Sequence, residues 1–287
     1  MILGITLGIS SAFIFSVYFI LLKFAVNKAS NFTVLASLMQ IISGLMFLPI
    51  ILFEGVKSKF SVSIFLLLGA MVLAYSLGSI FRTISYKGID VSINTLLQRI
   101  SLIVSFAGAI IVIGEPFKIN RFVGVLMILM GILILFVKTG NHKNIQQKML
   151  LFAIISPIGY GLGQLFDGMN SMNFSPAFYA GLGTFLPGVV LVIFAFFRKI
   201  TIKDFVGELR QNWLMILLMS LANTIGYYLL IVTYEFIDKS LAIPLLNLNA
   251  AFSVILGMII LKERRNMLRK IIATLVILAA VILLARA

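Results

Sequence analysis

The chain has 287 residues, of which 61% are hydrophobic and only 11% are charged. Soluble domains are usually about 45–50% apolar and about 25% charged, so this composition excludes a water-soluble globule. Lysine and arginine total 23 against 9 acidic residues, and in a soluble protein the resulting charge of +14 would suggest nucleic-acid binding. Here the basic residues lie between long apolar runs, so they indicate membrane topology and not a nucleic-acid partner.

Ten segments are long and apolar enough to cross a bilayer, because about 20 helical residues span about 30 Å of hydrocarbon. They are predicted at residues 3–24, 33–53, 61–81, 91–113, 119–137, 149–167, 176–197, 212–233, 240–261 and 268–285. The first run lacks a preceding basic residue and a clear cleavage site, so we expect a span and not a signal peptide. Loops and open sheets leave backbone groups unpaired in lipid, which predicts an all-α integral membrane protein with ten transmembrane helices.

The two halves of the sequence repeat a pattern of polar residues. An offset of 148 pairs Tyr86 with Tyr234, Asp90 with Asp238, Glu115 with Glu263 and Arg121 with Arg269, and an earlier offset of 142 pairs Tyr18 with Tyr160. Each half would hold five spans, so the second repeat must be inverted relative to the first, as in many secondary transporters. We expect a first five-helix repeat at residues 1–138, a linker at 139–148 and a second repeat at 149–287.

Several kinds of chemistry are excluded by residue type. The chain has no cysteine, which rules out disulfides and thiolate metal sites, and its single histidine, His142, lies in the expected linker. No Walker motif, zinc-protease helix or nucleophile elbow occurs, so neither ATP drive nor intramembrane catalysis is expected from this chain. We expect no metal, no cofactor and no ATPase subunit, and a monomer or weak dimer.

Basic residues also predict how the chain is oriented. The connectors after the first, third, fifth, seventh and ninth spans carry 16 of the 23, the opposite side carries 6, and Arg99 lies inside a span. Since cytoplasmic loops are enriched in lysine and arginine, the richer side is expected in the cytoplasm. Both termini of this multi-pass protein should then be extracytoplasmic, in a plasma or inner membrane.

Polar side chains inside the spans mark candidate substrate contacts, because such groups are rare in lipid and are usually functional. In the fourth span, Asn94 and Gln98 share a helical face, and Arg99 lies about 100° around the helix. The ninth span has Asn247 where the fourth has Arg99, and Asn249 two residues later. The remaining candidates, all on other spans, are Tyr18, Tyr75, Ser79, Tyr160, Gln164, Asn223 and Tyr227.

Each of these candidates has a structural alternative. Single Asn, Gln and Ser side chains also form interhelical hydrogen bonds, and tyrosines near span ends also anchor helices at the interface. Arg99 could snorkel to the headgroups. Asp167, the acidic residue closest to a span interior, is a candidate for proton coupling. Pro244 is expected in the first turn of its helix, Glu115 and Glu263 in capping or ion-pair roles, and the glycines near residue 160 in close helix packing.

Short motifs at matching places in the two halves point to a family. The first half reads Gly114-Glu115-Pro116-Phe117, followed by Gly124 and Gly131, and the second reads Lys262-Glu263-Arg264. With ten spans in two halves, the chain resembles the drug/metabolite transporter superfamily, and within it the EamA family of ten-span permeases. The resemblance implies a central cavity lined by spans 1, 3, 4, 6, 8 and 9, with spans 5 and 10 peripheral.

The leading hypothesis is therefore a secondary-active transporter, an exporter or exchanger, of a small polar or amphipathic metabolite such as an amino acid. It would work by alternating access at a central cavity between the repeats, and the metabolite class is implied by the resemblance. Arg99, Gln98 and Asn94 would bind an anionic group through charge-assisted hydrogen bonds. The alternative is a lipid or polyprenyl-phosphate translocase that holds its phosphate with Arg99 and Lys23.

Overall fold

The computed structural model of the protein describes residues 1–59, 61–85, 97–136, 147–260 and 267–285. The first half comprises α1 (Ile2–Lys28), α2 (Phe32–Met46), α3 (Leu48–Glu54), α4 (Val62–Ser85), α6 (Ile100–Ile111) and α7 (Ile119–Phe136). The second half comprises α8 (Gln147–Asn170), the short 3₁₀ helix η1 (Ser171–Asn173), α9 (Pro176–Phe197), α10 (Ile202–Thr233), α11 (Lys239–Leu246), α12 (Asn249–Ile260) and α13 (Met267–Ala285). Each of the ten predicted spans coincides with one or two of these helices, and the all-α membrane fold is confirmed.

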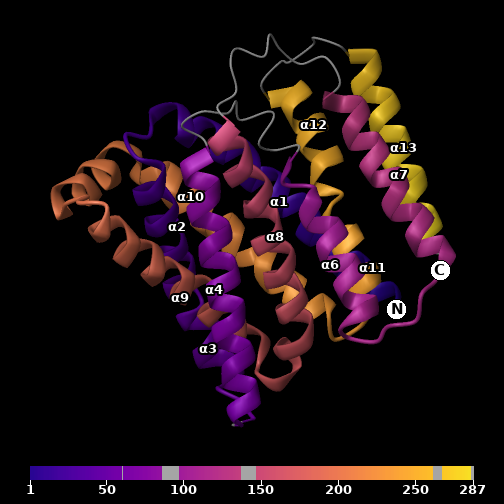
Figure 1. The fold of residues 1–287 in the computed structure, drawn as a ribbon, viewed down its shortest axis with the longest axis horizontal. Coiled ribbons are helices and arrows are strands. Elements are labelled where there is room, and N and C mark those ends of the chain that lie inside the picture. The colour runs from indigo at the N-terminus through magenta and orange to yellow at the C-terminus, as the bar shows by residue number, and fades with distance from the viewer. Residues whose placement is uncertain (60, 86–96, 137–146, 261–266, 286–287) are drawn as a thin grey trace.

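The helices differ in how much of a bilayer they can cross. Seven helical stretches in the described residues are long and apolar enough to span a membrane, and three further apolar helices are shorter. The shorter ones, at Ile100–Ile111, Ile119–Gly131 and Ile271–Ala280, lie in the predicted spans 4, 5 and 10. Both chain termini lie at the same end of the bundle, as an even number of crossings requires (Figure 1).

Packing between the helices follows a two-fold pattern. α4 packs along α8 as its counterpart α10 packs along α1, and α6 packs on α8 as α12 packs on α1. α2 packs on its own counterpart α9, and α7 on α13. The last pair lies side by side at one edge of the molecule, the peripheral position that the resemblance implied (Figure 1). This arrangement is that of two inverted repeats.

Glycines allow α8 to pack closely against α4 and α6. A Cβ atom on Gly159 would lie 2.7 Å from the carbonyl oxygen of Ala74, and one on Gly163 would lie 2.6 Å from the ring of Tyr75. On the opposite side, a Cβ atom on Gly161 would lie 2.8 Å from the carbonyl oxygen of Ser101. Small residues at helix crossings are the usual means of packing membrane helices, so the structural role expected for these glycines is confirmed.

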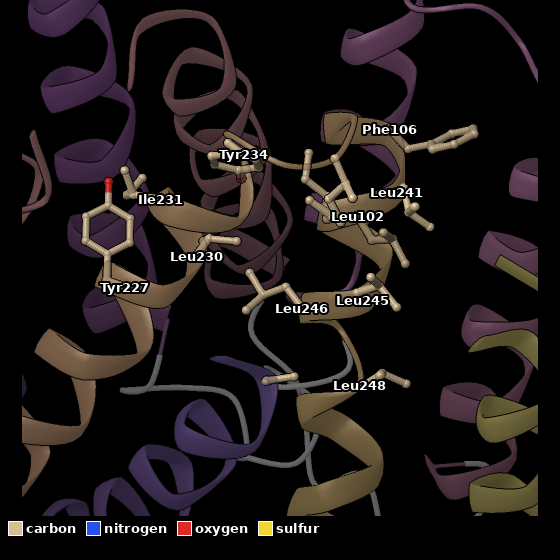
Figure 2. Packing of buried hydrophobic residues seen from close by; sticks show 14 of the residues in the cluster. Leu102, Phe106, Tyr227, Leu230, Ile231, Tyr234, Leu241, Leu245, Leu246 and Leu248 are labelled. Carbon is tan, nitrogen blue, oxygen red and sulfur yellow. The ribbon is translucent and has the colours of Figure 1, made fainter. Parts of the chain in front are cut away.

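The buried apolar core is centred where α10, α11 and α6 meet. α10 contributes Leu230 and Ile231, α11 contributes Leu241 and Leu245, and α6 contributes Leu102, all at most 4% exposed. Figure 2 shows Leu230 and Ile231 on α10 beside the leucines of α11 and α6. The core therefore joins helices of both repeats and fixes the start of the ninth span against the fourth.

α10 begins ten residues before the predicted eighth span. Thr201 and Asp204 form a capping box, in which the backbone N–H of Thr201 donates to Asp204 Oδ2 at 2.7 Å. This cap makes the polar segment helical, although the composition had predicted a connector there. The helix then kinks at Asn212, where φ is −123° and ψ is 15°, so the predicted start of the span marks the kink.

Candidate functional site

The fourth and ninth spans are both broken at matching positions. In the fourth, the backbone turns at Gln98 and Arg99, and the N–H of Leu102 donates to the carbonyl oxygen of Arg99 at 3.1 Å. In the ninth, the chain turns after Leu246, and the N–H of Ala250 donates to the carbonyl oxygen of Asn247 at 3.1 Å. The offset of 148 relates these two i→i+3 bonds, so the breaks are a feature of the repeat itself.

The expectation that Pro244 lies in a first turn is wrong. Pro244 is the sixth residue of α11, which ends two residues later at Leu246. Proline has no N–H to donate to the preceding turn, which weakens the helix at this point. The side chain of Asn247 closes the end of α11, because its Nδ2 donates to the carbonyl oxygen of Ile243 at 2.9 Å. A broken helix of this kind is typical of transporter binding sites.

Arg99 reaches across the interface between the repeats. Its Nη1 donates to Asn249 Oδ1 at 2.9 Å and to Asn247 Oδ1 at 3.3 Å. Arg99 and Asn247 are repeat-related, and two equivalent positions can only touch each other close to the axis that relates them. The guanidinium therefore lies near the pseudo-two-fold axis, and among the described residues its buried Nε has no hydrogen-bond partner.

A second polar network connects α4 with α8. Gln98 Nε2 donates to Ser156 Oγ at 3.0 Å, and Ser156 Oγ donates to the carbonyl oxygen of Gly78 at 2.8 Å. The hydroxyls of Ser79 and Tyr160 lie 2.7 Å apart, and the Arg82 guanidinium stacks 4.7 Å above the Tyr160 ring. The predicted residues Ser79 of span 3 and Tyr160 of span 6 thus contact each other directly, and Gln98 of span 4 reaches α8 through Ser156.

Asp167 is buried in a cluster of tyrosines. Tyr75 donates to its Oδ2 at 2.5 Å, and Tyr179 and Tyr227 donate to its Oδ1 at 3.0 and 2.9 Å. The carboxylate is fully buried. This cluster unites three predicted residues with Tyr179, which the sequence analysis missed because that tyrosine lies early in α9 with no polar stripe around it.

Glu115 and Arg121 join the two repeats at the start of the ninth span. Glu115 accepts the backbone N–H groups of Lys239 and Ser240, each at 2.9 Å, and thereby caps α11. Arg121, 4% exposed, donates to Asp238 at 2.6 Å and to the hydroxyl of Ser240 at 2.5 Å. The capping role expected for Glu115 is confirmed, whereas Glu263 lies outside the described residues.

Two further carboxylates that the sequence analysis missed play similar roles. Glu54 accepts the N–H of Ala177 at the start of α9 at 3.1 Å, and it also accepts the hydroxyl of Tyr228. Glu208, fully buried, accepts the backbone N–H of Ser30 at 3.0 Å, just before α2. Each glutamate thus holds a helix start in the other repeat, a long-range contact that leaves no local sequence signal.

The remaining predicted residues are Tyr18, Gln164, Asn223 and Asn94. Tyr18, 5% exposed, lines a pocket of about 20 Å³, room for roughly one water, together with Leu22, Phe32, Leu35, Ala36, Met39, Arg82, Thr83 and Met219. Gln164 is half-buried, and its Oε1 has no partner among the described residues. Asn223 is half-buried on α10. Asn94 lies outside the described residues, as does the side chain of Lys23.

Metal binding receives no support from the geometry. In the described part of the chain, no three His, Cys, Asp or Glu side chains gather as a metal site would require. The polar groups that meet Arg99 and Gln98 are amides and a hydroxyl, which suit hydrogen bonding to an organic ligand better than coordination of a cation.

The sequence matches the profile of the EamA-like transporter family twice, at residues 2–137 and 147–286. No curated protein matches the sequence. Of the solved structures, one described only as the crystal structure of a protein is similar to this chain, with 14% identity and a TM-score of 0.78. The similarity covers 98% of this chain and 95% of that one, and at such identity it shows the fold alone. Because the family profile covers nearly the whole chain, the protein belongs to the EamA-like transporter family, whose members are multi-pass membrane transporters of small molecules and not enzymes.

Proposed function

We propose that this protein is a secondary-active transporter of a small polar or amphipathic metabolite bearing an anionic group. The observation that carries the proposal is the position of Arg99, which bridges the two broken helices near the pseudo-two-fold axis. A site on this axis is equally related to both repeats, so exchange of their conformations can expose it to either side.

The electrostatics of Arg99 favour an anion as ligand. Among the described residues, no Asp or Glu oxygen lies within 4.0 Å of its guanidinium, and both contacts are neutral amide oxygens. An arginine at the centre of a bilayer costs about 2.5–3.5 kcal/mol to insert, so its charge is favourable there only with a partner. A carboxylate could accept hydrogen bonds from Nε and an Nη atom together, the bidentate geometry that arginine prefers.

The rest of the proposed site consists of the other predicted polar residues. Gln98 and Asn94 accompany Arg99 on the fourth span, and Asn247 and Asn249 face it from the ninth. We assign the amphipathic walls to the remaining candidates, Tyr18, Tyr75, Ser79, Tyr160, Gln164, Asn223 and Tyr227. The pocket beside Tyr18 holds only about one water, so helices must separate before a metabolite can enter there.

Topology and organisation complete the proposal. We propose repeats at residues 1–138 and 149–287 joined by the linker 139–148, and the basic side in the cytoplasm, because 16 of the 23 basic residues lie there. Both termini would then be extracytoplasmic, in a plasma or inner membrane. A C-terminal fluorescent protein fused to the chain should stay dark in a bacterial inner membrane, and a bright fusion would contradict this orientation.

The proposed role of Arg99 is tested by uptake into proteoliposomes. Loss of a charge-assisted pair of hydrogen bonds should weaken binding of an anionic metabolite about 10–100-fold in Arg99→Ala. Arg198→Ala removes an exposed arginine at the end of α9 and is the matched control. Equal uptake by Arg99→Ala and Arg198→Ala would refute Arg99 as a ligand-binding residue. Transport confined to a polyprenyl phosphate would instead indicate the lipid translocase.

A further inference from the structure

We propose that Asp167 and the tyrosines Tyr75, Tyr179 and Tyr227 form a proton-controlled latch between the repeats. In the ionised state the carboxylate holds four helices together, and one bound proton releases part of that contact. The inference rests on the proposed function only for its consequence, which is the coupling of transport to protons. The latch itself is a property of the protein without substrate.

The latch is defined by the helices that supply its parts. Asp167 lies near the end of α8, and its three donors come from α4, α9 and α10 at 2.5–3.0 Å. Three of these helices belong to the second repeat and α4 belongs to the first. The contact made by Tyr75 is therefore the one that crosses between the repeats, and it is also the shortest of the three.

Asp167 holds its charge without a cation. In the described part of the chain, no Lys or Arg nitrogen lies within 4.0 Å of its carboxylate, and its hydrogen-bond partners are neutral phenols. A buried carboxylate without an ion-pair partner depends on hydrogen bonds to remain ionised. A modest change in those bonds is then enough to favour the protonated form, which is what a coupling site requires.

The charged and titratable groups around the latch come from several elements. Directly after α10, the phenol of Tyr234 is buried near Asp167 and Glu115. From α11, the aliphatic part of Lys239 packs beside Gly168, next to Asp167 in the chain. α6 and η1, which also pack on α8, contain no ionisable side chain. In the described part of the chain, Tyr234 and Lys239 therefore come near Asp167 besides its own donors, and Glu115 lies beyond Tyr234.

Protonation changes the number of hydrogen bonds that the cluster can form. The ionised carboxylate only accepts, and it satisfies all three hydroxyls at once. When one proton binds to Oδ2, that oxygen becomes a donor directed at the hydroxyl of Tyr75, which must turn or withdraw. No other group gains or loses a proton in this step. The bond between the repeats weakens, while the bonds to Tyr179 and Tyr227 within the second repeat can persist.

The latch breaks the symmetry of the repeats. The offset of 142 places Ala25 where the second repeat has Asp167, and the offset of 148 places Asn223 opposite Tyr75. Ala25 is fully buried, so the related position in α1 contains neither a charge nor a donor. Of the two repeat-related positions, Asp167 near the end of α8 has a carboxylate and Ala25 near the end of α1 does not. With the proposed topology, the end of α8 is extracytoplasmic, where the proton concentration is commonly higher.

Distance measurements between spin labels test the latch directly. Because the chain has no cysteine, labels can be attached at Ser63→Cys on α4 and Phe236→Cys after α10, both of which are exposed. We expect the distance distribution to lengthen or broaden as the pH falls from about 9 to about 5. Asp167→Asn should show the low-pH distribution at every pH, whereas Asp204→Asn, which neutralises an exposed carboxylate, should keep the wild-type response.

A second variant and a second readout do not depend on the stability of Asp167→Asn. Tyr75→Phe removes one donor from the ionised carboxylate, so the transition should move upward by about one pH unit. In the otherwise unaltered protein, infrared difference spectra should show the carbonyl band of a protonated carboxylic acid appearing over the same pH range. A distribution that does not change with pH, or a pH response retained in Asp167→Asn, would overturn the proposal. Neither readout uses a transported substrate, so failure of the latch and failure of the proposed function are distinguishable.

Discussion

Removing the carboxylate of Glu115 should destabilise the protein, because this side chain caps the first half of the ninth span. Glu115 accepts two backbone N–H groups at 2.9 Å, and its Oε2 lies 3.9 Å from Nη1 of Arg121. Its side chain is only 10% exposed, so water cannot replace these contacts readily. When the Glu115 carboxylate is removed, Arg121 still donates to Asp238 and Ser240, so its buried charge does not lose all its partners.

The size of the effect follows from these contacts. Each hydrogen bond to a charged group contributes about 1.5–3 kcal/mol in soluble proteins, whereas interhelical bonds in membranes average about 0.6 kcal/mol. Two such bonds at a helix N-terminus should together contribute about 2–4 kcal/mol, so Glu115→Ala should lower the free energy of unfolding by that amount. Glu115→Gln keeps an acceptor oxygen and should lose about half as much. Because α11 leads to Asn247 and Asn249, ligand binding at Arg99 should weaken as well.

Equilibrium unfolding in mixed detergent micelles measures this difference. Val112→Ala is the control, since Val112 is an exposed residue in the connector that contains Glu115. If Glu115→Ala unfolded at the same denaturant concentration as Val112→Ala, the cap would be shown to add nothing to stability, and the reasoning from its geometry would be refuted.

Two further predictions concern packing and pH. Gly159→Ala should destabilise the protein by about 1–3 kcal/mol, because the added methyl would lie 2.7 Å from a backbone oxygen of α4. Gly69→Ala has nothing within 4 Å and should be neutral or slightly stabilising, so equal thermal stability of the two variants would contradict the close approach of α4 and α8. Partial burial and the nearby Glu54 raise the pKa of Glu235. The folded state therefore becomes less stable as the pH rises from the usual glutamate pKa through the raised pKa of Glu235. Above that pH range Glu235→Gln should have a higher melting temperature than wild type, and below it the two melting temperatures should be equal. A melting difference independent of pH would count against this effect.

Local patterns of the sequence were sufficient to predict most of the fold. Apolar run length located all ten spans, and the repeated polar residues predicted the inverted halves. The pattern failed where local capping outweighed hydropathy, as at Thr201 and Asp204, which extend α10 into a polar segment. It failed again at Pro244, whose position within its helix depends on where that helix begins. The helix begins at Lys239, so Pro244 is its sixth residue and does not lie in the first turn.

The candidate site was predictable in its residue types but not in its contacts. Helical spacing placed Gln98 and Arg99 on the fourth span, and the duplication indicated Asn247 as the counterpart of Arg99. That the two side chains touch depends on both helices breaking at the same depth, which hydropathy does not encode. Glu208 was missed for a related reason, since its partner Ser30 lies in a distant segment of the chain. Tyr179 was missed because no polar stripe surrounds it in α9.

The central claim is that Arg99 binds an anionic group of the substrate, and ligand-induced thermal stabilisation of the purified protein tests it most directly. A panel of metabolites would pair each carboxylate with its neutral amide, and would be measured on wild type and Arg99→Gln. A ligand that binds the folded state raises the melting temperature in proportion to its affinity and concentration. The account predicts that carboxylates stabilise wild type, and that their neutral counterparts and the Arg99→Gln variant show little shift. Equal stabilisation of Arg99→Gln and wild type by the same carboxylate would contradict it.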